Sequence, residues 1–78
     1  MKIKYIMTKN VYFDGEEARV GYGIAAVARE RGVQTVVEEF RDMSADREKV
    51  KSLIKLCNRG GLSLLHLSDV AEDFVLTT

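Results

Sequence analysis

The sequence has no proline or tryptophan, and it has only one cysteine and one histidine. A single cysteine excludes an internal disulfide, and a lone thiol is typical of a reducing compartment. No run approaches the ~20 apolar residues of a membrane-spanning helix, and the first residues lack the apolar segment of a signal peptide. We therefore predict a cytoplasmic protein that does not bind a membrane.

Charge and length narrow the class further. The chain has 12 basic and 12 acidic residues among its 78, so its net charge is zero. This balance argues against a dedicated nucleic-acid-binding protein, because such proteins gain affinity by neutralising phosphates.

We predict one domain, residues 1–78. So short a chain buries only about 60% of the surface that it exposes when unfolded, and dimerisation is a common way to bury more.

Residues 2–42 show the pattern of a β-meander. From Lys2 to Phe13 the odd positions are apolar except for Lys9, as in a strand with one covered face. Asp14-Gly15 predicts a hairpin turn. Apolar residues at alternate positions from Val20 to Ala28 then predict the return strand.

Parts of this meander allow more than one interpretation. Gly21 and Gly23 weaken the return strand unless another group packs closely over them or the strand bends. Ile24–Arg31 reads as a strand, although its alanines would also suit a short helix. After a turn at Glu30–Gly32, Val33–Arg41 predicts the third strand. Its apolar positions follow no single parity, which indicates either two partly covered faces or a β-bulge.

Residues 44–76 predict two short helices joined at Asn58–Gly61. Apolar residues recur at i, i+3, i+4 and i+7: Val50, Leu53, Ile54 and Cys57 in the first helix, and Leu67, Val70, Ala71 and Phe74 in the second. Ser44 and Ser63 suit the N-cap positions, and Gly60 suits the left-handed residue that ends a helix. We therefore predict an α+β fold, a three-stranded antiparallel sheet (β-β-β) followed by an αα-hairpin packed on one face.

Several short motifs resemble those of a family of short proteins of unknown function from clostridia and their relatives. Tyr22-Gly23-Ile24 matches a Y-G-I strand, and Cys57-Asn58 matches a C-N pair. Asp42-Met43-Ser44 resembles a D-I-S helix start, with Met43 in place of Ile. Leu62–Phe74 resembles the most specific motif, L-S-x-x-H-L-x-D-V-V-E-D-F, with Ala71 in place of the second Val and Leu64 where the family often has Pro. The resemblance covers residues 20–76. It implies a bacterial cytoplasmic protein with strands followed by two helices, and it implies no activity.

The single histidine lies near two carboxylates. On a helix, His66, Asp69 and Asp73 would form one stripe, and one imidazole with two carboxylates can hold a divalent ion. One helix face supplies at most three ligands, however, and the simpler interpretation is that His66 pairs with Asp69 or bonds to a strand backbone. These three residues are therefore weak candidates for a metal or small-ligand site, and we predict no cofactor.

Two other motifs suggest chemistry but fit a structural role better. Cys57 falls within the apolar stripe of the first helix, where burial raises the pKa of the thiol and makes it inert. Gly21–Ala26 matches the dinucleotide motif G-x-G-x-x-A, but no βαβ unit surrounds it. The glycines are expected to shape a bent strand instead. We predict no catalytic residue, and therefore no enzyme.

The two predicted helices carry opposite charges. Asp46–Arg59 has a net charge of +3 and Leu64–Leu76 a net charge of −3. The candidate interaction residues are Lys51, Lys55 and Arg59 in the first helix, and Asp69, Glu72 and Asp73 in the second. These groups either face solvent on neighbouring helices or form a surface for a twofold dimer or a partner of mixed charge.

The function that fits these features best is a non-catalytic protein-interaction or regulatory module that acts as a homodimer. The open face of the sheet is expected to present Ile6, Tyr12 and Val27 to a partner. One alternative is a metal- or small-ligand-binding protein that uses the stripe of His66, Asp69 and Asp73. Another is a nucleic-acid-associated regulator that uses Lys51, Lys55 and Arg59.

Overall fold

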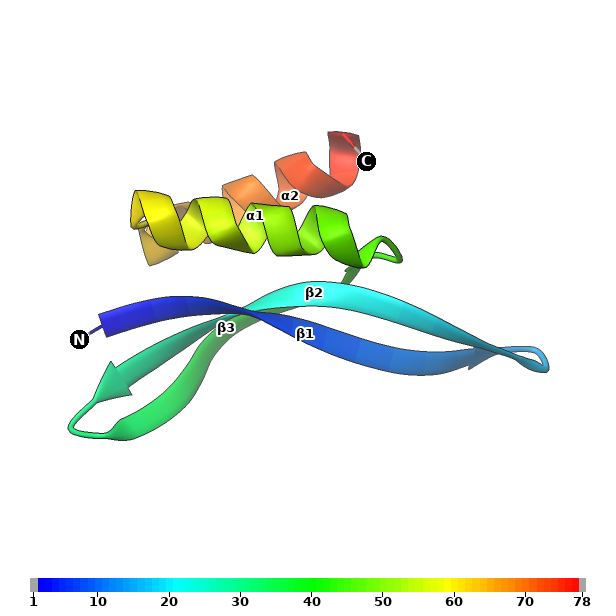
Figure 1. The fold of residues 1–78 in the computed structure, drawn as a ribbon, viewed down its shortest axis with the longest axis horizontal. Helices are drawn as coiled ribbons and strands as arrows, with labels where there is room; N and C mark the ends of the chain where they lie inside the picture. The colour runs from blue at the N-terminus through cyan, green and yellow to red at the C-terminus, as the bar shows by residue number, and fades with distance from the viewer. Residues whose placement is uncertain (1, 78) are drawn as a thin grey trace.

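The protein folds as a three-stranded sheet covered on one face by two helices (Figure 1). The computed structural model describes residues 2–77, with the side chains described through Leu76. In chain order the elements are β1 (Lys2–Asp14), β2 (Glu17–Glu30), β3 (Val33–Ser44), α1 (Arg47–Gly60), the 3-10 turn η1 (Leu64–His66) and α2 (Leu67–Thr77). The sheet is antiparallel with strand order β1-β2-β3. This confirms the predicted α+β fold.

Two tight turns connect the strands. Gly15 begins the first turn with φ +68°, and Arg31-Gly32 form the second with φ +53° and +80°. Positive φ at the first central residue, as in the first turn, or at both, as in the second, matches a hairpin turn to the right-handed twist of its strands. The predicted turns at Asp14-Gly15 and Glu30–Gly32 are confirmed. The strand interpretation of Ile24–Arg31 is also confirmed, except that the strand ends at Glu30.

The mixed parity of β3 results from bulges. Ala26 pairs with Glu38 but the next residue, Val27, pairs with Val36, so Val37 is left as the extra residue. A second shift lies between Tyr22 and Ile24 of β2. Of the two predicted explanations, the β-bulge is therefore confirmed.

The two strand glycines are needed because β3 passes closely over them. A Cβ atom at Gly23 would overlap the carbonyl oxygen of Phe40, and a Cβ atom at Gly21 would overlap the side chain of Asp42. Asp42 itself has φ +55°, a conformation that few residues other than glycine adopt. Of the two alternatives left open by the sequence, close packing of another group over the glycines is the one that these distances support.

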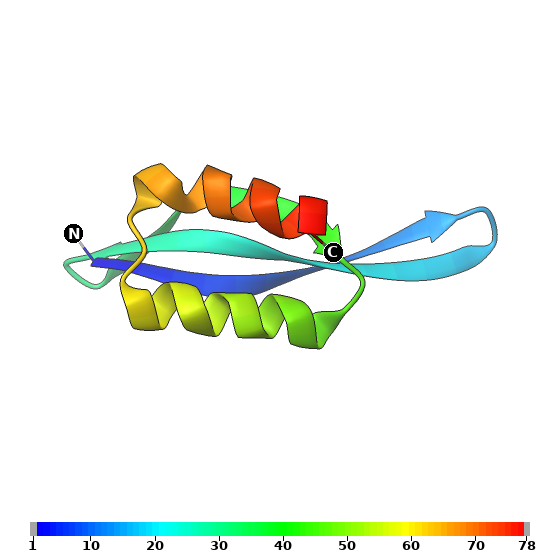
Figure 2. The same ribbon diagram turned by 90° about the horizontal axis from the view of Figure 1, so that it is seen from above.

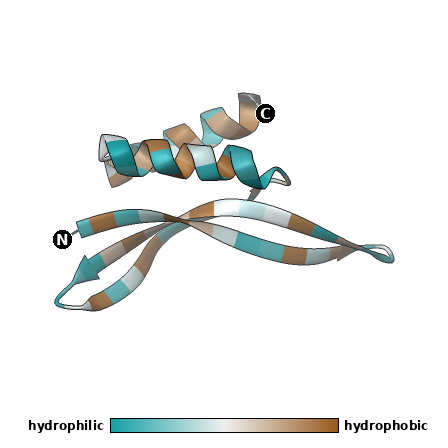
Figure 3. Cartoon of the chain, in the orientation of Figure 1, coloured by the Kyte–Doolittle hydropathy of each residue, from teal (hydrophilic) through white to brown (hydrophobic). Residues whose placement is uncertain are grey.

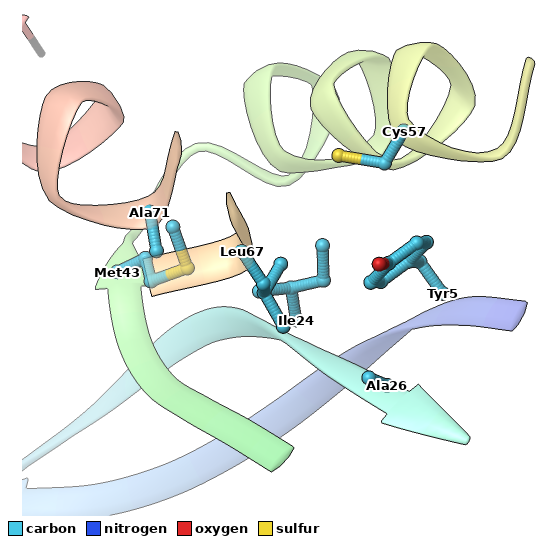
Figure 4. Close-up of a cluster of buried hydrophobic side chains, with 7 residues drawn as sticks. All are labelled: Tyr5, Ile24, Ala26, Met43, Cys57, Leu67 and Ala71. Carbon is cyan, nitrogen blue, oxygen red and sulfur yellow. The ribbon is translucent and has the colours of Figure 1, made fainter. Parts of the chain in front are cut away.

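The hydrophobic core lies between the sheet and the helices. Figure 4 shows its buried cluster, which consists of Tyr5, Ile24, Ala26, Met43, Cys57, Leu67 and Ala71. Leu53, Ile54, Val70 and Phe74 are partly buried and pack against this cluster. Both predicted helical stripes therefore face the sheet.

The helix ends differ from the prediction by one or two residues. Asp46, not Ser44, is the N-cap of α1. Its side chain accepts hydrogen bonds from the backbone N–H groups of Glu48 and Lys49. Ser44 remains in β3 because the bulged strand runs past Arg41, where it was predicted to end. Gly61, not Gly60, is the left-handed residue, with φ +60°.

The predicted open face of the sheet is only partly open. Val27 was expected to face a partner, but only 8% of it is exposed. It lies on the central strand between Lys4 of β1 and Val36 of β3, and these neighbours cover it.

Within residues 2–77, no helix is long and apolar enough to cross a membrane.

Candidate functional site

The β1–β2 hairpin extends beyond the helices as a two-stranded arm, residues 9–21 (Figure 1, Figure 2). Pairing with β3 ends at Tyr22 and Ser44, so the strands of the arm pair only with each other. A two-stranded hairpin is marginally stable in water unless a further strand or helix packs on it. In the described chain no helix reaches the arm.

One face of the arm is apolar, and neither of the described helices covers it (Figure 2). The register places Val11 opposite Val20 and Phe13 opposite Ala18, so these four side chains share one face. We call them the arm patch. Val11 is 58% exposed and Phe13 is 75% exposed. Figure 3 shows hydrophobic segments in the part of the hairpin that extends beyond the helices.

The arm patch corrects the sequence-based prediction for the first strand. Val11 and Phe13 have the same parity as Tyr5, which is buried beneath the helices, so the alternation predicted that they would be covered. They are uncovered because the helices end before the arm begins (Figure 2). Lys9 is exposed at the base of the arm and is therefore no misfit in a covered face.

A second apolar surface lies between the two helices, which run side by side over the sheet (Figure 2). The residues that line this helix groove are Leu53, Leu56, Cys57, Gly60, Leu62 and Val70. Leu56 lines this groove and is 62% exposed. The sequence pattern did not indicate this groove, because Leu56 lies outside the predicted stripe of α1.

Three hydrogen bonds join β1, an edge strand, to the end of α1 and to the segment that follows it. The backbone N–H of Tyr5 donates to Asn58 Oδ1 at 2.8 Å, and Asn58 Nδ2 donates to the Tyr5 carbonyl at 2.9 Å. The Tyr5 hydroxyl donates to the carbonyl of Leu62 at 2.7 Å. Sequence reasoning missed this role of Asn58, since an asparagine in the last turn of a helix carries no signal for a distant strand.

Cys57 is buried beside this junction. Burial raises the pKa of its thiol above the ordinary value. The pKa of Tyr5 is also raised, mainly by burial and further by the nearby Cys57. A neutral buried thiol is a poor nucleophile, so the environment of Cys57 agrees with the predicted structural role.

The candidate metal residues are placed on two elements. His66 lies in η1, outside α2, whereas Asp69 and Asp73 lie in α2, and all three are exposed. Ser63 caps η1 rather than α2, which corrects the prediction that His66 belongs to the second helix. In the part of the chain that the structure describes, no three His, Cys, Asp or Glu residues are grouped to hold a metal ion.

The candidate charged residues all lie on exposed helix surfaces. Lys51, Lys55 and Arg59 follow one stripe of α1, and Asp69, Glu72 and Asp73 lie on α2. The tip of the arm adds another charged group that sequence reasoning did not single out. Asp14–Arg19 has three carboxylates and one guanidinium, a net charge of −2, and Arg19 Nε contacts Asp14 Oδ2 at 3.2 Å.

Comparison with known proteins gives one match. The sequence model of DUF6514, described as a family of unknown function, matches residues 1–77. No curated protein and no solved structure matches the chain.

Proposed function

The chain belongs to DUF6514, a family of unknown function, and from this premise we propose that it is a non-catalytic protein-interaction module that acts as a homodimer. One observation supports this above all. The arm has an apolar face made by Val11, Phe13, Ala18 and Val20, on which the two largest side chains, Val11 and Phe13, are mostly exposed.

Covering this face would stabilise the chain in two ways. Removing apolar surface from water is favourable by about 25 cal/mol per Å². A partner that packs on the arm also supplies the further layer that a two-stranded hairpin needs for stability. The arm is therefore a part of the molecule that gains order as well as contacts when it binds another protein.

Two properties of the chain favour a second copy as the protein that binds. A chain of 78 residues has a small core, and oligomerisation is a usual means of adding buried surface to such domains. Its net charge is zero, so no overall charge repulsion opposes association between copies.

The oligomeric state in solution tests this proposal. We expect light scattering on a size-exclusion column, repeated over a concentration series, to give a mass that rises towards twice that of the chain. Circular dichroism on the same samples should show that secondary structure is present throughout the series. A strict monomer at hundreds of micromolar would overturn the proposal.

A further inference from the structure

We propose that the arm patch and the helix groove cover each other between two copies related by a twofold axis. Each arm would lie over the groove of the other copy, with Phe13 against Leu56. This inference rests on the proposed homodimer and names the two surfaces that meet in it.

The two surfaces match in chemistry but cannot meet within one chain. Both are apolar, and each contains a large side chain that is mostly exposed, Phe13 at 75% and Leu56 at 62%. The arm points away from the helices in both views (Figure 1, Figure 2). Only a second copy can bring an arm patch onto a helix groove.

The reach of the arm matches the position of the groove. Phe13 lies four residues beyond Lys9, which pairs with Tyr22 at the end of the three-stranded region; at ~3.3 Å per residue this is roughly 13 Å. Leu56 lies nine residues into α1 from Arg47; at ~1.5 Å per residue this is also roughly 13 Å. Since α1 begins at the arm end of the molecule (Figure 2), an arm that passes this end of the other copy reaches Leu56.

Charge favours the same arrangement. The tip of the arm, Asp14–Arg19, has a net charge of −2, whereas Lys51–Arg59 of α1 contains three cations and no carboxylate. The acidic side chains of α2 would repel the tip and direct it towards α1. Opposite charges of this kind orient partners and speed their encounter.

Symmetry allows both contacts to form in one dimer. The arm leaves the sheet at the end of the molecule where α1 begins (Figure 2). β1 and β2 cross over each other before they reach the arm (Figure 1, Figure 2), so the arm patch is turned relative to the part of the sheet that lies under the helices. A twofold axis can pair arm with groove twice and close the assembly, whereas a head-to-tail contact would continue into a filament.

Cross-linking between two variants that each add one exposed cysteine tests the contact. Phe13→Cys and Leu56→Cys protein are mixed, allowed to exchange subunits, and treated with a short bismaleimide. Both variants keep Cys57, but its thiol is buried, so the added cysteine is the accessible one. We expect a mixed adduct, identified by its intact mass, in several-fold higher yield than from Val33→Cys mixed with Leu56→Cys. Val33 is a matched control because it is also apolar and exposed, but it begins β3 at the other end of the sheet.

The possible outcomes distinguish failure of the arm–groove contact from failure of the proposed homodimer. A mixed adduct no more abundant than the Val33→Cys control, from protein that light scattering shows to be dimeric, would overturn the arm–groove contact and leave the homodimer standing. A strict monomer would overturn both. Lys55→Cys in place of Leu56→Cys repeats the test without removing an apolar contact, and we expect it to cross-link to Phe13→Cys as well.

Discussion

The side-chain amide of Asn58 bonds to both backbone polar groups of Tyr5. Tyr5 N–H donates to Asn58 Oδ1 at 2.8 Å and Asn58 Nδ2 donates to the Tyr5 carbonyl at 2.9 Å. This is the pairing that a neighbouring strand would provide, supplied instead by a helix side chain. Since β1 is an edge strand, Asn58 occupies hydrogen-bonding groups that would otherwise be open to another chain.

Asn58→Ala is expected to destabilise the fold by about 2 kcal/mol, because two hydrogen bonds worth about 1 kcal/mol each are lost. Urea unfolding followed by circular dichroism measures the change. Arg59→Ala is the matched control: Arg59 is the next residue of the same helix and is exposed, so its removal should change the free energy of unfolding by less than about 0.5 kcal/mol. Equal losses in the two variants would show that the Asn58 bridge contributes nothing specific.

Alanine substitutions at two glycines should have opposite signs. In Gly23→Ala the new Cβ would overlap the Phe40 carbonyl oxygen and lie 2.9 Å from Thr8 Oγ1. A backbone atom cannot move aside as a flexible side chain can, so we expect the free energy of unfolding to fall by about 3 kcal/mol.

Gly60 is the last residue of α1 and a Cβ there meets nothing within 4 Å. Gly60→Ala should therefore stabilise the protein by about 0.5–1 kcal/mol, because glycine is a poor helix former. Thermal unfolding of the two variants beside the parent gives both signs in one experiment.

Local patterns predicted the elements of this fold because each element follows its own periodicity. The apolar stripes through Val50 and Leu67 predicted two helices with one buried face, and both residues are fully buried. The turn at Asp14-Gly15 needed only the tolerance of glycine for positive φ. The N-cap of α1 was predicted at Ser44, but it is Asp46. The error arose because β3 is lengthened by bulges, and these bulges depend on how β3 pairs with β2. No local sequence pattern shows that pairing.

The candidate site was harder to predict because it depends on how far one element extends past another. Parity placed Val11 and Phe13 on the same face of β1 as Tyr5, which is buried. Whether a helix lies above them depends on where α1 and α2 end relative to the hairpin. The same limit applies to Val27, which its neighbouring strands cover although its parity points away from the helices.

Stability should fall in alkaline solution in a way that depends on Cys57. Burial raises the pKa of this thiol from its ordinary value of 9.0, so the unfolded chain loses the proton first. The stabilisation from the neutral thiol is complete below pH 9.0 and is lost as the pH rises through the folded pKa. Tyr5, whose pKa is raised from 10.0, adds to the decline in the same direction at higher pH.

Urea midpoints measured from neutral pH to pH 10.0 check this dependence. Cys57→Ala is expected to lower the midpoint at every pH, because a buried side chain becomes smaller, but to flatten the decline above pH 9.0. If the slope of the variant equals that of the parent, the buried thiol is not the group responsible.

Phe13→Ser should weaken dimerisation without weakening the fold of one chain. Phe13 is 75% exposed in the single chain, so its substitution should change the free energy of unfolding of the monomer by less than about 0.5 kcal/mol. An aromatic side chain buried at the centre of an interface is often worth 2 kcal/mol or more. We therefore expect the dimer dissociation constant from sedimentation equilibrium to rise by roughly tenfold or more.

Val33→Ser is the control for the loss of exposed apolar surface in general. Val33 is 64% exposed, but it lies at the start of β3 rather than on the arm. The dissociation constant of Val33→Ser should match that of the parent, because this end of the sheet takes no part in the arm–groove contact. A rise of similar size in both variants would mean that association follows overall surface hydrophobicity, and an unchanged constant in Phe13→Ser would place the interface away from the arm.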